Sequence, residues 1–303
     1  MGAQLRVYRR QIRATKSTRQ ITKAMELIAA SRIAKAQNRI RAARPYAAEL
    51  TRALAALSQN SSLKHPLLTG AENPSRAAIL VITADRGLAG GYSSNAIKQA
   101  NELAEQLRAQ GKEPVLYLIG RKAVTYYRFR NLSYADAWTG FSEQPNFVNS
   151  REAASVLVRE LERTGAQGGV DELHLIYTEF VSRVTQTARS TQLAPIAQAD
   201  LGADAELAGD GPKPAYDFEP EADELLKTLL PRYISARIFA GLLESAASES
   251  AARQAAMKSA SDNASELIRT YTRLANQARQ AEITQEISEI VGGADALAAA
   301  AAE

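Results

Sequence analysis

The sequence predicts an α/β protein in which two long terminal helices form an antiparallel coiled coil, plus a small Rossmann-like α/β domain with a mostly parallel sheet. Three observations favour this fold class. Both ends of the 303-residue chain carry long helical segments whose apolar residues recur at steps of three and four. The middle alternates short apolar runs with amphipathic segments. A glycine- and proline-rich stretch then separates the middle from the C-terminal segment.

The C-terminal segment Arg232–Val291 has no proline, and before Gly292 its only glycine is Gly241. Its apolar or small residues at three-four spacing are Tyr233, Ala236, Ala240, Leu243, Ala247, Ser250, Met257, Ala264, Ile268, Tyr271, Ala275 and Ala278. This pattern is typical of a coiled-coil seam rather than of the broad apolar face of a globular helix. A helix of about sixty residues measures ~90 Å, whereas a compact chain of this length is ~50 Å across. We therefore expect the helix to project and to meet a partner.

The N-terminal segment Leu5–Leu57 predicts the second long helix. Its later half has a regular seam of Ile33, Ala36, Ile40, Ala43, Ala47, Leu50, Leu54 and Leu57. Extended backwards, the seam becomes polar, while Ile21, Met25 and Ile28 form an apolar stripe on a different face. One face can thus pack on the other helix while the second stays available outside. Seams at opposite ends of the chain predict antiparallel pairing.

The middle of the chain predicts the α/β domain. The run Ala77–Thr83 is continuously apolar before its last residue, as expected of a strand buried on both faces. Further strands are expected at Pro114–Ile119, Glu172–Val181 and Thr187–Ile196. Helices are expected at Ser94–Gln110, near Arg121–Arg128, and from a capping Ser150 to before Gly165. The expected domains are residues 1–57 (N-terminal coiled-coil helix), 77–200 (α/β head domain), 201–224 (connector) and 225–303 (C-terminal long coiled-coil helix).

Composition narrows the function classes. There is no cysteine, so disulfides and thiolate metal sites are excluded, and His65 and His174 stand in unrelated contexts. No apolar run is long enough to span a membrane. The net charge is only +4, yet up to Arg52 the basic residues face just two acids, Glu26 and Glu49. A basic helix of this kind fits either a nucleic-acid-binding coiled coil or a helix beside acidic protein surfaces.

The first strand leads into a glycine-rich turn, Asp85–Tyr92, before a helix. Such a turn could cradle a phosphate, but it matches neither the dinucleotide nor the P-loop motif. Gly120-Arg121-Lys122 after the second strand could meet a 2′-phosphate, which keeps an NADP-binding α/β protein with helical arms as an alternative. No Ser/His/Asp set, carboxylate cluster or metal spacing is present. We expect no catalytic residue, cofactor or metal in this chain.

Three separated motifs resemble the gamma subunits of the rotary F-type ATP synthases. The opening run includes Thr18-Arg19-Gln20-Ile21-Thr22-Lys23-Ala24-Met25-Glu26 and the central one is Asp85-Arg86-Gly87-Leu88-Ala89-Gly90-Gly91. The C-terminal one is Ile283-Thr284-Gln285-Glu286-Ile287-Ser288-Glu289-Ile290-Val291-Gly292-Gly293-Ala294. The resemblance covers nearly the whole chain. It departs at Ala89, where many members carry Cys, and at Gly165–Gly169, a longer connection that is either an inert insertion, the interpretation we favour, or a control element.

The resemblance implies a non-catalytic subunit, the central rotor shaft of the F1Fo ATP synthase. The shaft couples ion-driven rotation of the membrane ring to conformational changes at the catalytic beta subunits, for ATP synthesis. Implied partners are the alpha and beta subunits of the F1 head, the epsilon subunit and the membrane c-ring, with neither nucleic acid nor direct membrane insertion. The implied location is peripheral, on the cytoplasmic face of a bacterial plasma membrane.

The resemblance also implies contact residues. Contacts to a beta subunit would come from Met25, Arg279, Gln280, Thr284 and Glu286, and contacts to the rotor ring from Tyr216, Phe218 and Glu219. The sequence alone offers two interpretations of the first set. Beyond Ala278 the seam reaches Glu282, Gln285 and Glu289, so this band either binds polar partners or is an ordinary solvated helix face.

Overall fold

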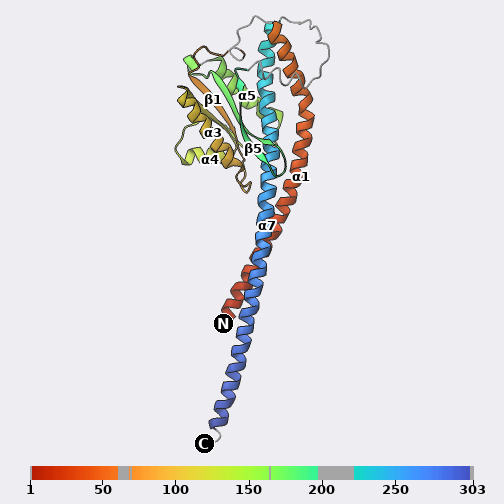
Figure 1. The fold of residues 1–303 in the computed structure, drawn as a ribbon, viewed down its shortest axis with the longest axis vertical. Helices are drawn as coiled ribbons and strands as arrows, with labels where there is room; N and C mark the ends of the chain where they lie inside the picture. The colour runs from red at the N-terminus through yellow and green to blue at the C-terminus, as the bar shows by residue number, and fades with distance from the viewer. Residues whose placement is uncertain (1, 61–67, 69, 164, 197–221, 301–303) are drawn as a thin grey trace. The chain divides into compact units, whose positions relative to one another are not determined.

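A computed structural model of the chain describes residues 2–60, 68, 70–163, 165–196 and 222–300. The chain divides into two compact units, which are described separately. Unit 1 comprises Met1–Ile28 and Ala255–Glu303, and unit 2 comprises Ala29–Gln254. Two long helices, α1 (Gly2–Asn60) and α7 (Ala222–Ala300), each contribute residues to both units (Figure 1).

Unit 2 contains a five-stranded sheet. Its strands are β1 (Arg76–Ile82), β2 (Glu113–Ile119), β3 (Asp136–Trp138), β4 (Glu172–Phe180) and β5 (Gln186–Ala194). Their order is β3-β2-β1-β4-β5, and only the β4–β5 pair is antiparallel. The apolar run of β1 is buried on both faces, as the sequence predicted. The mostly parallel sheet of the predicted fold class is confirmed.

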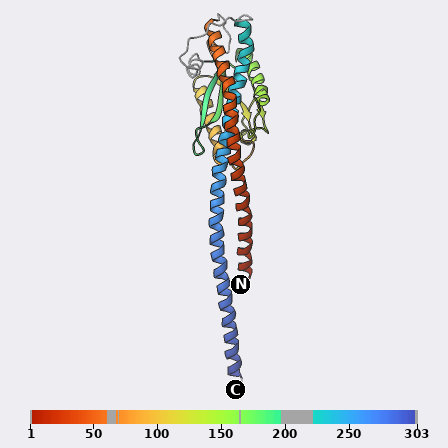
Figure 2. The same cartoon turned by 90° about the vertical axis from the view of Figure 1, so that its right-hand side faces the viewer.

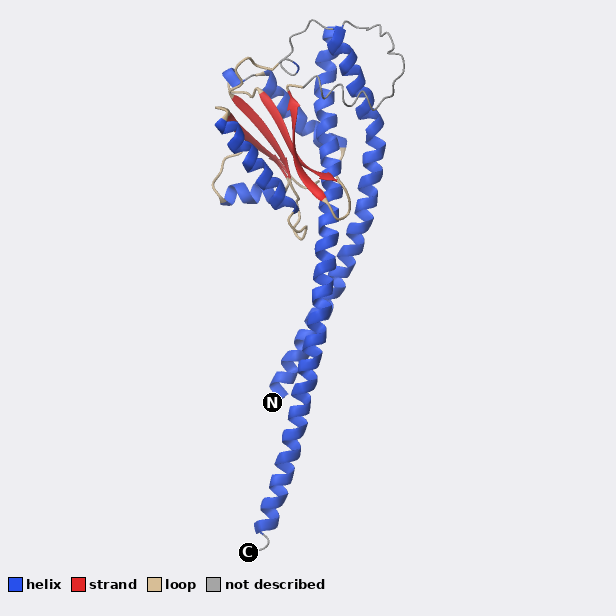
Figure 3. Cartoon of the chain, viewed as in Figure 1, coloured by secondary structure: helices blue, strands red, loops and turns tan. Residues whose placement is uncertain are grey.

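The sheet lies between two helical layers within unit 2 (Figure 3). On one face, α3 (Tyr92–Ala109) and α4 (Arg121–Phe129) cover side chains such as Ile79 and Leu118. On the other face, α5 (Phe147–Glu162) and the unit 2 segments of α1 and α7 cover Leu80 and Leu173. The unit 2 segments of α1 and α7 lie side by side in two perpendicular views (Figure 1 and Figure 2). The terminal helices are therefore part of the core of this unit.

Between Gly241 and Ala251, α7 is buried on all sides apart from half-buried Glu244, whereas Arg232 and Ala240 before it are exposed. Burial here extends beyond the predicted seam residues, because α7 contacts the sheet on one side and α1 on another. Gly241 permits the contact with the sheet: a Cβ at this position would stand 2.8 Å from Leu175 Cδ2. A side chain at position 241 would therefore force the Leu175 side chain to shift.

In unit 1 the predicted seam is confirmed. Met257, Ala264 and Ala275 of α7 are buried there, and Ile268, Tyr271 and Ala278 are half-buried. On α1, Thr22 is buried at the matching register, whereas Ile21 and Ile28 are 58% and 53% exposed. The two faces predicted for this part of α1 are thus distinct. One packs within the unit and the other presents apolar side chains outward.

Some predicted boundaries were wrong. α7 begins at Ala222 and runs through Pro231, whereas the sequence predicted a start at residue 225. α5 is capped by Asn146 rather than Ser150: Asn146 and Asn149 each accept the other's backbone N–H at 3.0 Å. Ser150 is already helical, and its hydroxyl donates to the Phe147 carbonyl. β3 was not predicted, since three residues are too few to give a periodicity.

The longer connection Gly165–Gly169 is tied to the start of β1. It contains a 3-10 turn, Gly165–Gln167, and one carboxylate holds it: Asp171 accepts backbone N–H groups from Gly165 at 2.7 Å and Ser75 at 2.8 Å. Arg76 donates to the Gly169 carbonyl at 2.9 Å. Burial raises the pKa of the Asp171 carboxyl, but these backbone hydrogen bonds outweigh burial and lower the pKa below its ordinary value.

Gly120, between β2 and α4, has no room for a side chain. Its φ is 95°, and a Cβ there would lie 2.2 Å from the Thr83 carbonyl oxygen. We expect Gly120→Ala to lower the free energy of unfolding by at least ~3 kcal/mol, because overpacking adds to backbone strain. Gly111→Ala is the matched control, since Gly111 has a φ of 80° with nothing within 4 Å, and should cost only ~1 kcal/mol. Urea unfolding of the purified chain measures both, and equal losses would contradict the steric explanation.

Candidate functional site

The carboxyl ends of β1 and β4 form the crevice where folds of this class bind dinucleotides. In this chain α7 fills that crevice. The Thr178 backbone N–H donates to the Ser245 hydroxyl at 3.2 Å, and the Ser248 hydroxyl donates to the Thr178 carbonyl at 3.0 Å. The Phe180 N–H donates to the Glu244 carboxylate at 3.3 Å. The end of β4 therefore bonds to a helix of its own chain where an NADP-binding protein would bond its ligand.

Tyr92, the first residue of α3, is buried at the same crevice beside Ala84 and Ala89, and half-buried Ala252 of α7 packs against this group. Burial raises the pKa of the Tyr92 hydroxyl far above its ordinary value, and the charge of Glu249 adds to the shift. The phenol thus stays neutral and serves packing rather than acid–base chemistry.

The glycine-rich turn is organised by Asp85. Its carboxylate accepts backbone N–H groups from Arg121 at 3.1 Å, Gly140 at 2.8 Å and Ser142 at 3.0 Å. The backbone N–H of Asp85 in turn donates to the Ser142 hydroxyl at 2.9 Å. At the amino end of α4, a carboxylate of the protein stands where a bound phosphate would otherwise be stabilised. The Asp85 carboxylate thus occupies the position that a phosphate of NADP would need, which argues against the NADP-binding alternative.

Five charged side chains form what we call the Glu143 cluster: Arg32, Arg86, Glu143, Glu249 and Arg253. Arg253 and Glu249, one turn apart on α7, pair at 2.7 Å with side chains only 5% and 1% exposed. Arg253 also pairs with Glu143 at 3.3 Å, and Arg86 pairs with it at 3.6 Å. Arg32 forms a further ion pair with Glu143. Arginine side chains from α1, α7 and the glycine-rich turn thus converge on one carboxylate, which the segment before α5 supplies.

Burial decides how the Glu143 cluster behaves. It raises the pKa of the Glu249 carboxyl above its ordinary value, because the loss of water outweighs the attraction of Arg253. Removing one partner of a buried ion pair leaves an uncompensated charge, at a cost of ~3–5 kcal/mol. Arg253 also donates to the Gly87 carbonyl at 3.4 Å, which ties the glycine-rich turn directly to α7.

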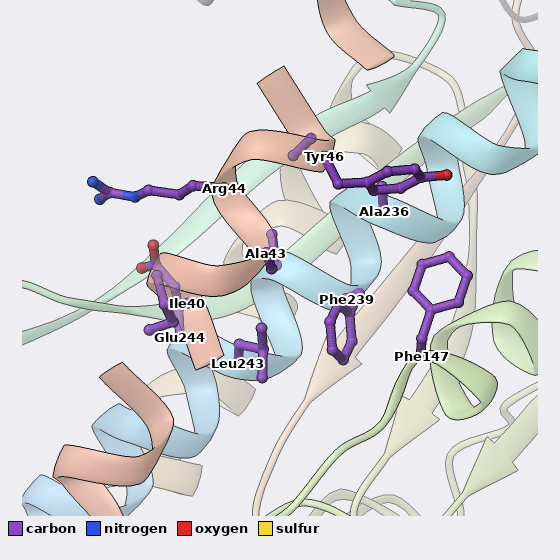
Figure 4. A pocket seen from close by; sticks show the side chains of 11 residues that line it. Ile40, Ala43, Arg44, Tyr46, Phe147, Ala236, Phe239, Leu243 and Glu244 are labelled. Carbon is purple, nitrogen blue, oxygen red and sulfur yellow. The ribbon is translucent and has the colours of Figure 1, made fainter. Parts of the chain in front are cut away.

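An apolar groove of about 380 Å³ lies between α1 and α7 beside the start of α5 (Figure 4). Phe147 stands edge-on to Phe239 at 5.6 Å between ring centres and to Tyr46 at 6.4 Å. Figure 4 shows Arg44 extending away from these rings. Burial raises the pKa of Glu244, which also lines the groove. The lining is suited to packing and offers no nucleophile or acid–base pair.

The residues predicted to contact a beta subunit all lie in unit 1. Met25 is half-buried on α1, and Arg279, Gln280, Thr284 and Glu286 are exposed on α7. The Thr284 hydroxyl donates to the Gln280 carbonyl at 3.0 Å, so it is bonded within its own helix. Of the predicted rotor-ring residues, Tyr216, Phe218 and Glu219 lie outside the described residues.

The Glu143 cluster as a whole was not predicted from the sequence. Arg32 and Glu143 are far apart in the chain, and nothing in their local context sets them apart. One part carried a signal: Glu249 and Arg253 are a charged pair at i, i+4 within a run of small residues. A charged pair flanked by Ala and Ser on all sides of a helix indicates burial with mutual compensation.

Within the described residues, no group of three or more His, Cys, Asp or Glu side chains could hold a metal ion. The imidazole of His174 lies 3.1 Å from the carboxylate of Glu172, and such a pair is too small to form a metal site. Across the same part of the chain, no helix combines the length and the apolar character needed to cross a membrane.

A family model described as ATP synthase matches residues 4–297. The ATP synthase gamma chain of Parafrankia sp. (strain EAN1pec) is 58% identical over 301 residues, covering 99% of this chain and 100% of the relative. The ATP synthase gamma chain of Thermobifida fusca (strain YX) is 56% identical, covering 100% of this chain and 99% of the relative.

Solved structures agree in fold. A chain of the Euglena gracilis mitochondrial ATP synthase, OSCP/F1/c-ring, rotational state 3, superimposes with a TM-score of 0.67 at 16% identity and covers 98% of this chain and 95% of its own. A chain of the Tetrahymena thermophila central stalk/c-ring has a TM-score of 0.56 at 22% identity, covering 80% of this chain and 99% of its own. At such identities the likeness concerns the fold alone.

Asp85 provides a test of how the glycine-rich turn is held. We expect Asp85→Ala to lower the free energy of unfolding by ~3 kcal/mol, since three backbone N–H groups lose their acceptor at ~1 kcal/mol each. Asp136→Ala is the control: Asp136 is exposed, and among the described residues its carboxylate accepts only the N–H of Ala137, at 2.7 Å. The control should cost less than ~1 kcal/mol. Thermal unfolding followed by circular dichroism compares the variants, and a similar loss in both would show that Asp85 does not organise the turn.

Proposed function

Because the chain belongs to the family of ATP synthase gamma chains, we propose that it is the central rotor shaft of an F1Fo ATP synthase. In this role it couples ion-driven rotation of the membrane ring to conformational changes at the catalytic beta subunits, and so to ATP synthesis. One observation carries the proposal: α7 is a single 79-residue helix that belongs to the core of both units. A continuous hydrogen-bonded helix passes rotation along its length without relying on a flexible linker.

The filled crevice supports the same proposal. The α/β unit uses its ligand-binding edge to hold α7, through Ser245, Ser248 and Glu244. When a helix of the same chain occupies the crevice, the helix is held rigidly against the sheet and the crevice can no longer bind a ligand. The chemistry of ATP formation then belongs to the beta subunits, and this chain supplies position and movement.

The proposed partners are the alpha and beta subunits of the F1 head, the epsilon subunit and the c-ring. Structural neighbours include chains of assemblies described as central stalk/c-ring and as rotor, rotational state 1. We place the chain peripherally at the cytoplasmic face of a bacterial plasma membrane, because attachment to a membrane ring holds it there. The curated relatives cited above come from bacteria.

The proposed contacts to a beta subunit are Met25, Arg279, Gln280, Thr284 and Glu286. Exposure supports this assignment, since Arg279 and Gln280 present adjacent polar side chains on the outer side of α7. The planar guanidinium of an arginine can make two parallel hydrogen bonds to a carboxylate. A partner loop carrying an acid would therefore be recognised during part of each turn.

We expect the double variant Arg279→Ala/Gln280→Ala to assemble normally but to lower ATP synthesis and hydrolysis per complex. Losing a charge-assisted contact of ~1.5–3 kcal/mol in a rotational intermediate would slow turnover by about ten- to a hundred-fold. Arg273→Ala/Gln277→Ala removes two exposed residues of the same types from the same helix and is the control. ATP turnover is measured per assembled complex. Wild-type turnover in Arg279→Ala/Gln280→Ala would contradict the proposed contact and would mean that these residues belong to an ordinary solvated helix face.

The proposed ring contacts Tyr216, Phe218 and Glu219 yield a separate prediction. An aromatic pair beside a carboxylate is unusual in a glycine- and proline-rich connector, and aromatic side chains dominate interface energetics. Tyr216→Ser/Phe218→Ser should release the F1 part from washed membranes but spare its ATP hydrolysis in solution. Phe129→Ser removes an aromatic that is 86% exposed on the α/β unit and serves as the control. Retention of both variants on the membrane would mean that residues 216–219 do not contact the ring.

A further inference from the structure

We propose that Glu143 is a positioning residue that fixes α1, α7 and the glycine-rich turn to one another where both helices leave unit 2. It would keep the α/β unit and the two helices turning together when rotation is under load. The inference deepens the proposed function and rests on it.

The geometry of the cluster singles out Glu143. Its Oε1 pairs with Arg253 of α7 at 3.3 Å, and its Oε2 pairs with Arg86 of the glycine-rich turn at 3.6 Å. Oε2 also pairs with Arg32 of α1. Within the described residues, the ion pairs of Arg32 and Arg86 are to Glu143 alone. One carboxylate thus joins three segments that are distant in the sequence.

The segment that carries Glu143 belongs to the α/β layers. It connects β3 to α5 and is itself bonded to the glycine-rich turn that follows β1, since Asp85 accepts the backbone N–H of Ser142 at 3.0 Å. The side chain of Glu143, in contrast, contacts arginines of the two long helices. Glu143 therefore links the sheet to both helices through side chains rather than through the backbone.

The position along the helices matters as much as the contacts. Unit 2 ends between Ile28 and Ala29 on α1 and between Gln254 and Ala255 on α7. Arg32 and Arg253 consequently lie within about one turn of these two limits. The cluster sits where a twist of the helices against the sheet would begin, and there an ion-pair network resists twisting most effectively.

The charge of Glu143 is needed, as well as its shape. The cluster holds three arginines and two glutamates, and Glu249 is already committed to Arg253 at 2.7 Å. Replacing Glu143 by glutamine keeps the size but leaves three positive charges facing one negative charge. Arg32, whose side chain is only 26% exposed, would then lose its counter-charge and repel its neighbours.

The test separates work under load from work without load. In the detached F1 part, hydrolysis turns the helices while the α/β unit moves freely, so little torque crosses the cluster. Synthesis in energised membrane vesicles must transmit the full torque of the ring through it. We expect Glu143→Gln to lower synthesis per assembled complex about ten-fold, the equivalent of one charge-assisted hydrogen bond, while hydrolysis by detached F1 stays near wild type.

Two further variants keep the test decisive. Glu102→Gln breaks an exposed ion pair with Lys98 on α3 and is the control that should match wild type in both assays. Arg86→Gln removes the most exposed arm of the cluster, at 71%, and should lower synthesis in the same direction if Glu143→Gln does not fold. Glu143→Asp, which retains the charge, should recover part of the lost synthesis.

Each outcome has one meaning. If Glu143→Gln and Arg86→Gln give the same synthesis-to-hydrolysis ratio as Glu102→Gln, the proposed role of Glu143 is wrong. The role is equally contradicted if Glu143→Gln lowers only the amount of complex, because that is a folding effect. Failure of the wild-type chain to restore synthesis to membranes that lack it would instead contradict the proposed function itself.

Discussion

The contact of α7 with the sheet is the interaction on which the rest of the structure depends. Gly241 brings the helix backbone against Leu175, and the apolar residues that follow on both sides of the helix are buried because of this approach. Leu230, Ile234 and Ile238 of α7 and Leu54 of α1 belong to one core with the sheet. Neither terminal helix is an appendage of the α/β unit. Each contributes apolar area whose removal from water, at roughly 25 cal/mol per Å², stabilises the unit.

Close packing at the crevice buries polar backbone groups, and side chains of the same protein form hydrogen bonds to them. The backbone at the end of β4 is bonded by Ser245 and Ser248, and the N–H groups around the glycine-rich turn are bonded by Asp85. Buried polar groups require such partners, because an unpaired one costs ~1–3 kcal/mol. The Glu143 cluster follows the same rule with charges: buried Arg253 is acceptable since two carboxylates face it. These bonds occupy backbone groups that a nucleotide would otherwise use, whereas the Tyr92 hydroxyl and Thr178 Oγ1 are buried without a hydrogen-bond partner among the described residues.

Residue pattern accounted for the parts of the fold that local periodicity controls. The apolar run of β1 and the seam of Met257, Ala264 and Ala275 follow from burial on one or two faces. The features that the residue pattern could not predict depend on packing between residues that are distant in the sequence. The burial of α7 on nearly all sides between Gly241 and Ala251 requires the sheet beside it, which a seam cannot reveal. The cap at Asn146 rather than at Ser150 is a local choice between similar signals. The Glu143 cluster joins residues that only the fold brings together, so one sequence by itself carries just the Glu249–Arg253 portion.

The shared core also has a consequence for how the chain is made. The sheet is complete once β5 has left the ribosome, but one of its faces is covered in part by α7 residues near Leu230 and Leu242, 36 and 48 positions after Ala194. At synthesis rates of ~5–20 residues per second, that face waits several seconds for its cover. During this interval only α1 and α5, of the helices that cover Leu80, Leu173 and Leu175, have been made. The core of unit 2 can therefore close only after the C-terminal part of the chain is synthesised, unlike a core whose covering helices all precede its last strand.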